Sequence, residues 1–244
     1  MEKILIVNAD DFGLSPGVNR GIIECVEHGI VTSASLMVRW PAAPEAAAYA
    51  KQNRAISLGL HVDLGEWVLR DGGWQQLYHV VDSNDPIAVA AEIRDQVDKF
   101  FSLVGIPPSH LDSHQHIHRE EPTRSLMLEL ARELGVPLRE FTPTLRYFGG
   151  FYGQGADGES LPDLLTIANL QNILNSLRSG MTELGCHPGY GDDLASPYRQ
   201  ERATEVRVLC APAARAAVAS AGFRPGNFAE AKSPAFSRRA LIAD

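Results

Sequence analysis

The sequence has few cysteines, and none of them are closely spaced. Cys25, Cys186 and Cys210 are the three cysteines among 244 residues, and they form no C-x-x-C motif. An odd number of widely separated cysteines is not the pattern of a disulfide framework in a secreted domain. We therefore expect reduced thiols and a cytoplasmic location.

Long apolar runs and an excess of positive charge are also missing. No stretch approaches the roughly 18 apolar residues of a membrane-spanning helix, and the N-terminus lacks the apolar core of a signal peptide. The 22 lysines and arginines face 30 aspartates and glutamates, which gives a formal charge of -8. This balance argues against a nucleic-acid partner. We expect no transmembrane segment and a small-molecule substrate, and homo-oligomerisation stays open.

Short apolar runs alternate with amphipathic segments along most of the chain. The expected strands are 3–9, 33–38, 55–64, 109–114, 136–141, 181–187 and 223–228. The expected helices are 18–29, 43–52, 85–105, 122–135, 161–178 and 199–221. Such alternation predicts parallel strands joined by right-handed crossovers. About seven units favour an α/β fold of the (β/α) barrel-like, TIM-barrel-related type over an open sheet.

The chain shows no linker, so we expect a single domain over residues 1–231. Residues 232–244 are expected to form a C-terminal tail. The segment 142–160 is rich in glycine and aromatic residues, and we expect it to be a loop over the site.

Two adjacent carboxylates, Asp10 and Asp11, end the first expected strand in the segment NADDFG. In parallel α/β folds, ligands bind at the carboxyl ends of the strands. An isolated Asp-Asp pair is also common in turns and helix caps. The position at a strand end favours a functional role.

Histidines follow the ends of three other expected strands. His61 lies in LGLHVDL, His187 lies in GCHPGY, and LDSHQHIH contains His114, His116 and His118. A lone histidine is more often a packed or exposed structural residue than a ligand. Four strand ends that meet at one rim nevertheless favour a shared site. Mixed aspartate and histidine donors suit one divalent metal ion, zinc or magnesium first, with manganese or cobalt as alternatives.

The alternating histidines allow three arrangements. On a strand, all three share one face at spacings of about 6–7 Å. On a helix, His114 and His118 form an i,i+4 pair, another common metal motif. In the third arrangement one histidine is a ligand, and the others contact the substrate or support the ligand.

The segments ILIVNADDFGLSPGVNRGIIECVEHGIVTSASLMV, GLH, HLDSHQHIH, VPLR and CHPG occur in this order. Together they resemble the YdjC-type (ChbG-like) carbohydrate deacetylase family over nearly all of residues 1–231. Members of this family hydrolyse the N-acetyl group of amino sugars, including chito-oligosaccharides. A hopanoid-biosynthesis-associated branch, to which the chain is somewhat similar, acts on a sugar-bearing lipid.

The resemblance implies that Asp11, His61 and His114 bind the metal. It further implies that Asp10 is the general base and that His187 is the general acid in hydrolysis of a linear amide C–N bond.

The remaining candidates have supporting or substrate-binding roles. Asp112 is expected to accept the second N–H of an imidazole. His116 and His118 are expected around the substrate. For Arg139, substrate binding and a structural ion pair stay open. Two other functions also stay open, namely a metal hydrolase of another amide or ester and a non-catalytic sugar-binding protein of the same fold.

Overall fold

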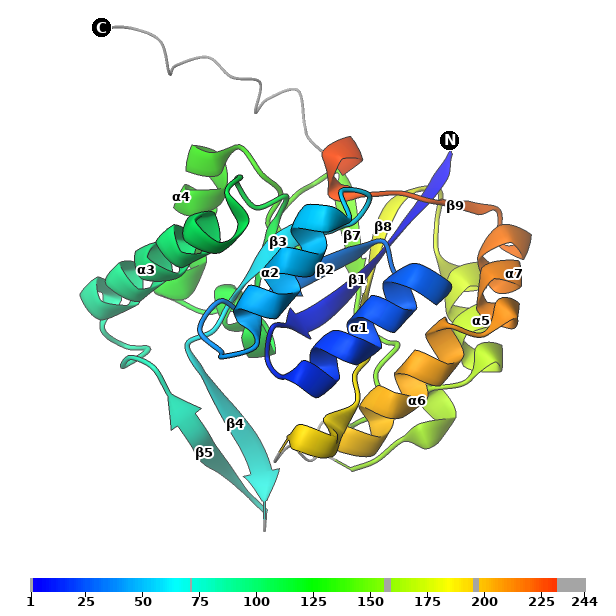
Figure 1. Ribbon diagram of the computed structural model, residues 1–244, viewed down its shortest axis with the longest axis horizontal. Coiled ribbons are helices and arrows are strands. Elements are labelled where there is room, and N and C mark those ends of the chain that lie inside the picture. The colour runs from blue at the N-terminus through cyan, green and yellow to red at the C-terminus, as the bar shows by residue number, and fades with distance from the viewer. Residues whose placement is uncertain (1, 71, 156–158, 195–197, 232–244) are drawn as a thin grey trace, which may run out of the picture.

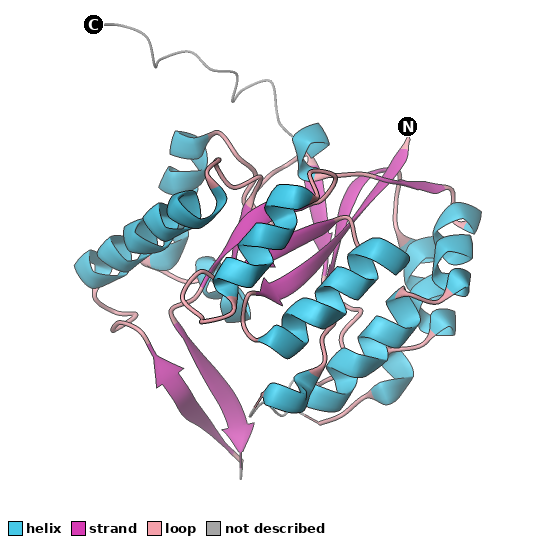
Figure 2. Cartoon of the chain, viewed as in Figure 1, coloured by secondary structure: helices cyan, strands magenta, loops and turns pink. Residues whose placement is uncertain are grey.

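The computed structural model describes residues 2–70, 72–155, 159–194 and 198–231. Within these residues a parallel sheet of seven strands forms the centre, and helices pack around it (Figures 1 and 2). The strand order is β6-β3-β2-β1-β8-β7, and β9 pairs with β1. The strands of this sheet are β1 (Lys3–Phe12), β2 (Ser33–Leu36), β3 (Ser57–Val62), β6 (Leu111–Ser113), β7 (Leu145–Phe148), β8 (Gly180–Cys186) and β9 (Phe223–Pro225).

Seven α-helices connect these strands in the described residues. They are α1 (Pro16–His28), α2 (Ala43–Gln52), α3 (Pro86–Val104), α4 (Thr123–Leu134), α5 (Ile167–Ser176), α6 (Arg199–Leu209) and α7 (Pro212–Ser220). Local sequence sets several of their ends. The Ser15 side chain caps α1, and the Asp85 side chain caps α3 by accepting two backbone N–H groups. Gly105 ends α3 in the left-handed conformation, with φ of 81°.

The central strand β1 carries polar residues into the core. Every residue of β1 from Leu5 to Phe12 is buried, and this stretch includes Asn8, Asp10 and Asp11. Buried carboxylates are costly unless they are paired or bind a cation. The sequence of β1 therefore requires cationic partners at its carboxyl end.

The sheet has two edges, which makes it an incomplete barrel. At one edge, an isolated parallel bridge joins Leu111 of β6 to Leu138. At the other edge, β7 pairs with β8. The parallel sheet with helices between its strands confirms the predicted barrel-like α/β fold.

The prediction of a strand over 136–141 was wrong. Only Leu138 makes a bridge there, because Pro137 has no N–H to donate and Glu140 adopts a positive φ of 65°. The strand in this part of the chain is β7, which lies inside the segment 142–160 that we expected to be a loop. Two of the aromatic residues of that segment, Tyr147 and Phe148, belong to this short strand and are half-buried.

Two other segments differ from prediction. An antiparallel hairpin, β4 (Gly65–Arg70) and β5 (Gly73–His79), projects from the body of the molecule (Figure 1). The helix expected over 199–221 is two helices, because Ala211 before Pro212 is extended, with ψ of 137°. The expected tail 232–244 lies outside the described residues.

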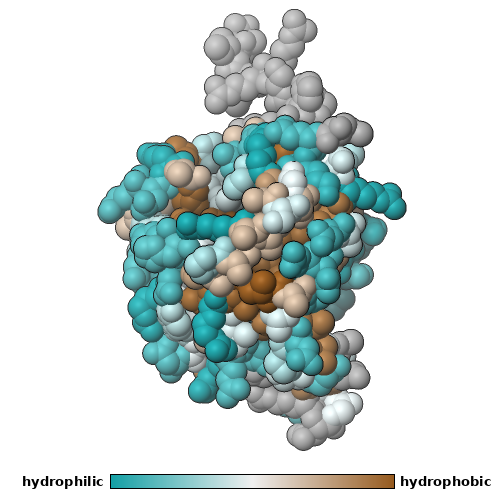
Figure 3. Space-filling view, turned by 90° about the vertical axis from the view of Figure 1, so that its right-hand side faces the viewer, coloured by the Kyte–Doolittle hydropathy of each residue, from teal (hydrophilic) through white to brown (hydrophobic). Residues whose placement is uncertain are grey.

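The surface is mixed in polarity. Figure 3 views the side on which α5, α6 and α7 lie in Figure 1, and hydrophilic residues there surround a smaller apolar area. Within the described ranges, none of the helices combines the length and the apolar character needed to span a membrane.

Candidate active site

Six of the nine predicted site residues line one cavity of about 700 Å³, and these are Asp10, Asp11, His61, His114, His116 and His187. Asp112, His118 and Arg139 do not line it. Asp10 and Asp11 come from the end of β1, His61 from β3, His114 from the residue after β6, and His187 from the residue after β8. The carboxyl ends of these parallel strands meet at one rim, as expected for ligand sites in α/β folds.

Adjacent residues of a regular strand point to opposite faces, so Asp10 and Asp11 need a local irregularity to share a cavity. Asp11 has a positive φ of 67°, and the pairing of β1 with β2 shifts register between Ala9 and Phe12. This bulge re-aims the Asp11 carboxylate. Both carboxylates consequently line the same cavity.

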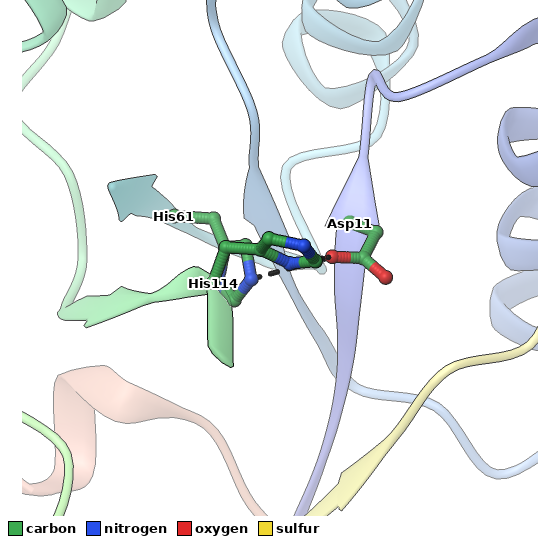
Figure 4. Close-up of side chains that lie close together, drawn as sticks. All are labelled: Asp11, His61 and His114. Atoms are coloured by element: carbon green, nitrogen blue, oxygen red, sulfur yellow. Dashed lines mark hydrogen bonds and ion pairs between the residues drawn. The ribbon is translucent and has the colours of Figure 1, made fainter. Parts of the chain in front are cut away.

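Asp11 faces two imidazole rings (Figure 4). Its Oδ1 lies 3.3 Å from Nε2 of His61 and 3.2 Å from Nδ1 of His114. Ligand atoms bound at about 2.0–2.2 Å to one zinc-like ion stand ~3–4 Å apart. One carboxylate oxygen and two ring nitrogens in this arrangement fit a divalent ion in both spacing and donor chemistry.

The other polar side-chain atoms of His61 and Asp11 have partners that fix their orientation, whereas Nε2 of His114 is buried without a hydrogen-bond partner in the described residues. His61 Nδ1 lies 2.8 Å from Oδ1 of Asp112, and Asp112 in turn accepts from the Ser35 hydroxyl at 2.5 Å. Arg202 donates to Oδ2 of Asp11 at 2.6 Å. A carboxylate that holds the second nitrogen of a histidine is a common support of metal ligands.

Carboxylates around the two imidazoles favour a positive charge on the rings. Burial lowers the pKa of His61 and of His114, but the nearby carboxylates outweigh this effect. Asp112 and Asp11 raise the pKa of His61 to about 10, and Asp11 and Glu66 raise the pKa of His114 to about 9. An environment that attracts a proton this strongly also attracts a metal cation.

Arg139 lies beneath the cavity and is not exposed to it, since the residue is 1% exposed. Its guanidinium donates to both oxygens of Asp10, at 2.6 and 2.7 Å. It also lies 2.8 Å from Asp112 and 2.6 Å from Glu183. Of the two interpretations of Arg139, the structure therefore favours the structural ion pair. Although burial raises the pKa of Asp10, Arg139 brings it below its usual value.

His187 also lines the cavity and lies close to Asp10. Its Nε2 lies 3.7 Å from Asp10 Oδ2. Its backbone N–H donates to Glu205 at 2.5 Å, which fixes the turn after β8. Burial lowers the pKa of His187 to about 4, so its ring is uncharged at neutral pH. A role as an acid requires the ring to gain a proton during turnover.

The structure brings only one of the three alternating histidines to Asp11. Gln115 and His116 adopt positive φ values of 50° and 54°, so neither a strand nor a regular helix continues from His114. His118 turns away and lies against Ser113 at 2.6 Å. Of the three histidines only His114 faces Asp11, and neither the strand arrangement nor the helical i,i+4 pair occurs. The third arrangement, with one ligand and two supporting histidines, stays a prediction.

Sequence reasoning missed several charged residues of the site. Arg202 and Glu205 belong to α6, whose amphipathic pattern does not distinguish buried charges from solvated ones. Glu183 had a detectable signal, because it interrupts the apolar strand segment MTELGC. A single charge inside an expected buried strand requires a partner, and here that partner is Arg139.

Aromatic side chains form part of the cavity walls. The hairpin of β4 and β5 contributes Trp67 and Trp74, and the segment around β7 contributes Tyr147 and Phe148. Tyr152 lies edge-on to the His187 ring, with centroids 5.1 Å apart. Aromatic faces beside polar groups suit the apolar faces and hydroxyl groups of a sugar.

The fold and this rim define a barrel-like α/β protein with an Asp-His-His group of the metal-binding type. Residues 4–220 match the family described as YdjC-like protein. The chain belongs to this family.

Sequence relatives agree with this assignment. The chitooligosaccharide deacetylase of Serratia marcescens is 35% identical over 93% of this chain and 99% of its own length. That of Yersinia enterocolitica is 33% identical over 94% of this chain and 100% of its own length.

Among solved structures, an Enterococcus faecalis protein ascribed to cellobiose-phosphate cleavage has a TM-score of 0.78 at 23% identity, over 96% of this chain and 100% of its own. A family 4 carbohydrate esterase from Streptomyces lividans, in complex with acetate, has a TM-score of 0.56 at 11% identity, over 92% of each chain. These two structures share the fold.

Proposed function

We propose that this protein is a metal-dependent carbohydrate N-deacetylase that removes the acetyl group from an amino sugar. The observation that carries the proposal is the arrangement of Asp11, His61 and His114 around one point, directly beside Asp10 and His187. The names of the relatives support chito-oligosaccharides as the substrate class. An amino sugar carried on a lipid is the second candidate.

The metal would be one divalent ion held by Asp11, His61 and His114. Zinc and magnesium are the first candidates, and manganese and cobalt are alternatives. When bound, such an ion polarises the acetamide carbonyl and lowers the pKa of the attacking water. The Asp10–His61–Asp112 group shares His61 with this set, and Arg139 bonds both of its carboxylates, so we assign the ion to the Asp11 group.

Asp10 acts as the general base. It accepts the proton that the water loses as its oxygen attacks the carbonyl carbon. The two hydrogen bonds from Arg139 keep Asp10 ionised and hold its carboxylate in one orientation. Arg139 is therefore a positioning residue in this mechanism.

His187 delivers a proton to the departing nitrogen, without which cleavage of the C–N bond would expel an amide anion. The ring is uncharged before the reaction, because burial lowers its pKa. Asp10 Oδ2 lies 3.7 Å from the ring, so the proton taken from water has a short path to the amine through His187. The products are acetate and the free amine, and the proton count balances.

Acetate release tests the proposal. The metal-stripped protein is incubated with N-acetylglucosamine oligomers and with simple esters, before and after return of zinc or magnesium. We expect acetate from the oligomers only after an ion is restored. Ester cleavage without oligomer cleavage would favour the alternative amide or ester hydrolase. Oligomer binding with no turnover under any ion would favour a non-catalytic sugar-binding protein.

A further inference from the structure

A second group of metal-type donors lies beside the Asp11 site. It consists of His116, His118 and Glu140, and one donor atom from each lies within 4.8 Å of the others. Nδ1 of His116 is 3.7 Å from Oε2 of Glu140, and Nε2 of His118 is 3.6 Å from the same oxygen. These distances are too long for hydrogen bonds, although all three atoms face one another.

The two ring nitrogens in this group are buried without partners. Across the described residues, neither Nδ1 of His116 nor Nε2 of His118 has a hydrogen-bond partner. His118 is fully buried, with 0% exposure. A buried nitrogen without a hydrogen-bond partner destabilises the folded protein, so two such nitrogens close to one carboxylate are an unusual arrangement.

The other ring nitrogen of each histidine has a hydrogen-bond partner. His118 Nδ1 lies 2.6 Å from the Ser113 hydroxyl, and that hydroxyl also accepts the backbone N–H of His118 at 3.0 Å. His116 Nε2 lies 3.4 Å from the Tyr147 hydroxyl. If these nitrogens carry the ring protons, the lone pairs of the other two point toward Glu140. This is the way metal-binding histidines are oriented in proteins.

The Glu140 carboxylate is already paired with one positively charged side chain, that of Arg119. Arg119 donates to its two oxygens at 2.5 and 2.6 Å, and the Arg119 side chain is 48% exposed. The guanidinium reduces the attraction of Glu140 for a further cation. Arg119 bonds Oε2, the oxygen that faces both imidazoles, whereas Arg202 bonds Oδ2 of Asp11 and leaves Oδ1 to face His61 and His114. The donor group should therefore bind an ion more weakly than the Asp11 site.

We propose that His116, His118 and Glu140 form a second, weaker binding site for a divalent cation of the zinc type. Two imidazole nitrogens and one carboxylate oxygen are the donors that such an ion prefers. His116 and Glu140 line the cavity, so water can complete the coordination. This site is separate from Asp11, His61 and His114, and it does not depend on the proposed deacetylase activity.

Titration of the chelator-stripped protein with zinc, by calorimetry, tests the proposal. Cobalt absorption spectra give an independent count of bound ions. We expect two ions in the wild-type protein, one tight and one weaker. Glu140→Gln should weaken the second ion by at least about tenfold and leave the first unchanged, since one of three donors loses its charge. Asp11→Asn should weaken the first ion and leave the second unchanged.

Arg119→Gln should change the affinity of the weaker ion in the direction opposite to Glu140→Gln. Removing the guanidinium frees Glu140, so the weaker ion should bind roughly tenfold more tightly. Because Arg119 is half exposed, this variant also keeps the proposal testable should Glu140→Gln fail to fold. Glu27→Gln is the matched control, since Glu27 and His28 form an exposed carboxylate–imidazole pair at 4.0 Å. Glu27→Gln should change the affinity of neither ion.

Three results would overturn the proposal. The first is a single bound ion in the wild-type protein. The second is the same two affinities in wild type and Glu140→Gln. The third is a weaker ion that disappears in Glu27→Gln, which would identify it as bound at the surface.

Discussion

Arg202 donates a 2.6 Å hydrogen bond to Oδ2 of Asp11, and this leaves Oδ1 to face His61 and His114. The same guanidinium also contacts the backbone carbonyl of His187 at 3.2 Å. One buried side chain of α6 thus orients the ligand candidate of β1 and the turn that follows β8. The site depends on a helix far away in the sequence.

Arg202→Gln should weaken metal binding by about 10- to 100-fold, because the Asp11 carboxylate would lose the partner that orients it. The measurement is the dissociation constant for zinc or cobalt in a competition assay with a chelator. Arg207→Gln, at an exposed position of the same helix, is the matched control. Equal affinity in Arg202→Gln and Arg207→Gln would show that Arg202 does not support Asp11.

Arg139→Met should lower the free energy of unfolding by about 3–5 kcal/mol at neutral pH, because buried carboxylates would lose their counter-charge. The carboxylates affected are Asp10, Asp112 and Glu183. Urea denaturation provides the measurement. The unfolding free energy of Arg139→Lys should lie between those of wild type and Arg139→Met. An ammonium keeps the positive charge but lacks the planar guanidinium that bonds several carboxylates at once. A loss below about 1 kcal/mol in Arg139→Met would contradict the described network.

His110 should make stability depend on pH. Its ring is buried, lies 3.0 Å from the Ser35 hydroxyl and stacks on Phe228 at 3.6 Å. Burial lowers the pKa of His110 from 6.5 to about 4. Between these values the unfolded chain holds a proton that the folded protein does not, so stability contributed by the neutral ring is complete above pH 6.5 and is lost as the pH falls toward 4.

The test compares wild type with His110→Gln at equal metal content. As the pH falls from 6.5 to 4, the unfolding free energy of wild type should drop relative to the variant by up to about 1.4 kcal/mol per pH unit. Parallel curves for the two proteins would mean that His110 titrates alike in the folded and unfolded states.

Local sequence was sufficient for much of the fold. The apolar run of β1, the Asp85 cap and the Gly105 stop of α3 act through neighbouring residues, so pattern and capping predict them. The segment 136–141 looks like a strand by its apolar residues. Its structure is decided instead by Pro137 and by the positive φ of Glu140, which pattern does not report.

The candidate site was predictable where it depends on strand ends. Asp11, His61 and His114 follow from that rule, together with the family resemblance. The position of His116 away from Asp11 could not be predicted from the sequence, because the turn at Gln115 is stabilised by a distant segment. The Gln115 side chain exchanges two hydrogen bonds, at 2.9 and 2.7 Å, with the backbone of Trp67 in the hairpin. Only the tertiary structure brings these residues together.

Acetate release by Asp10→Asn tests the proposed role of Asp10 as the general base, and the metal content is determined in the same sample. Asp10 is not one of the three proposed metal ligands, so the ion should stay bound. We predict full metal content and a fall in turnover of about 10²- to 10⁴-fold, the typical contribution of a general base. Unchanged turnover with the metal bound would contradict the account.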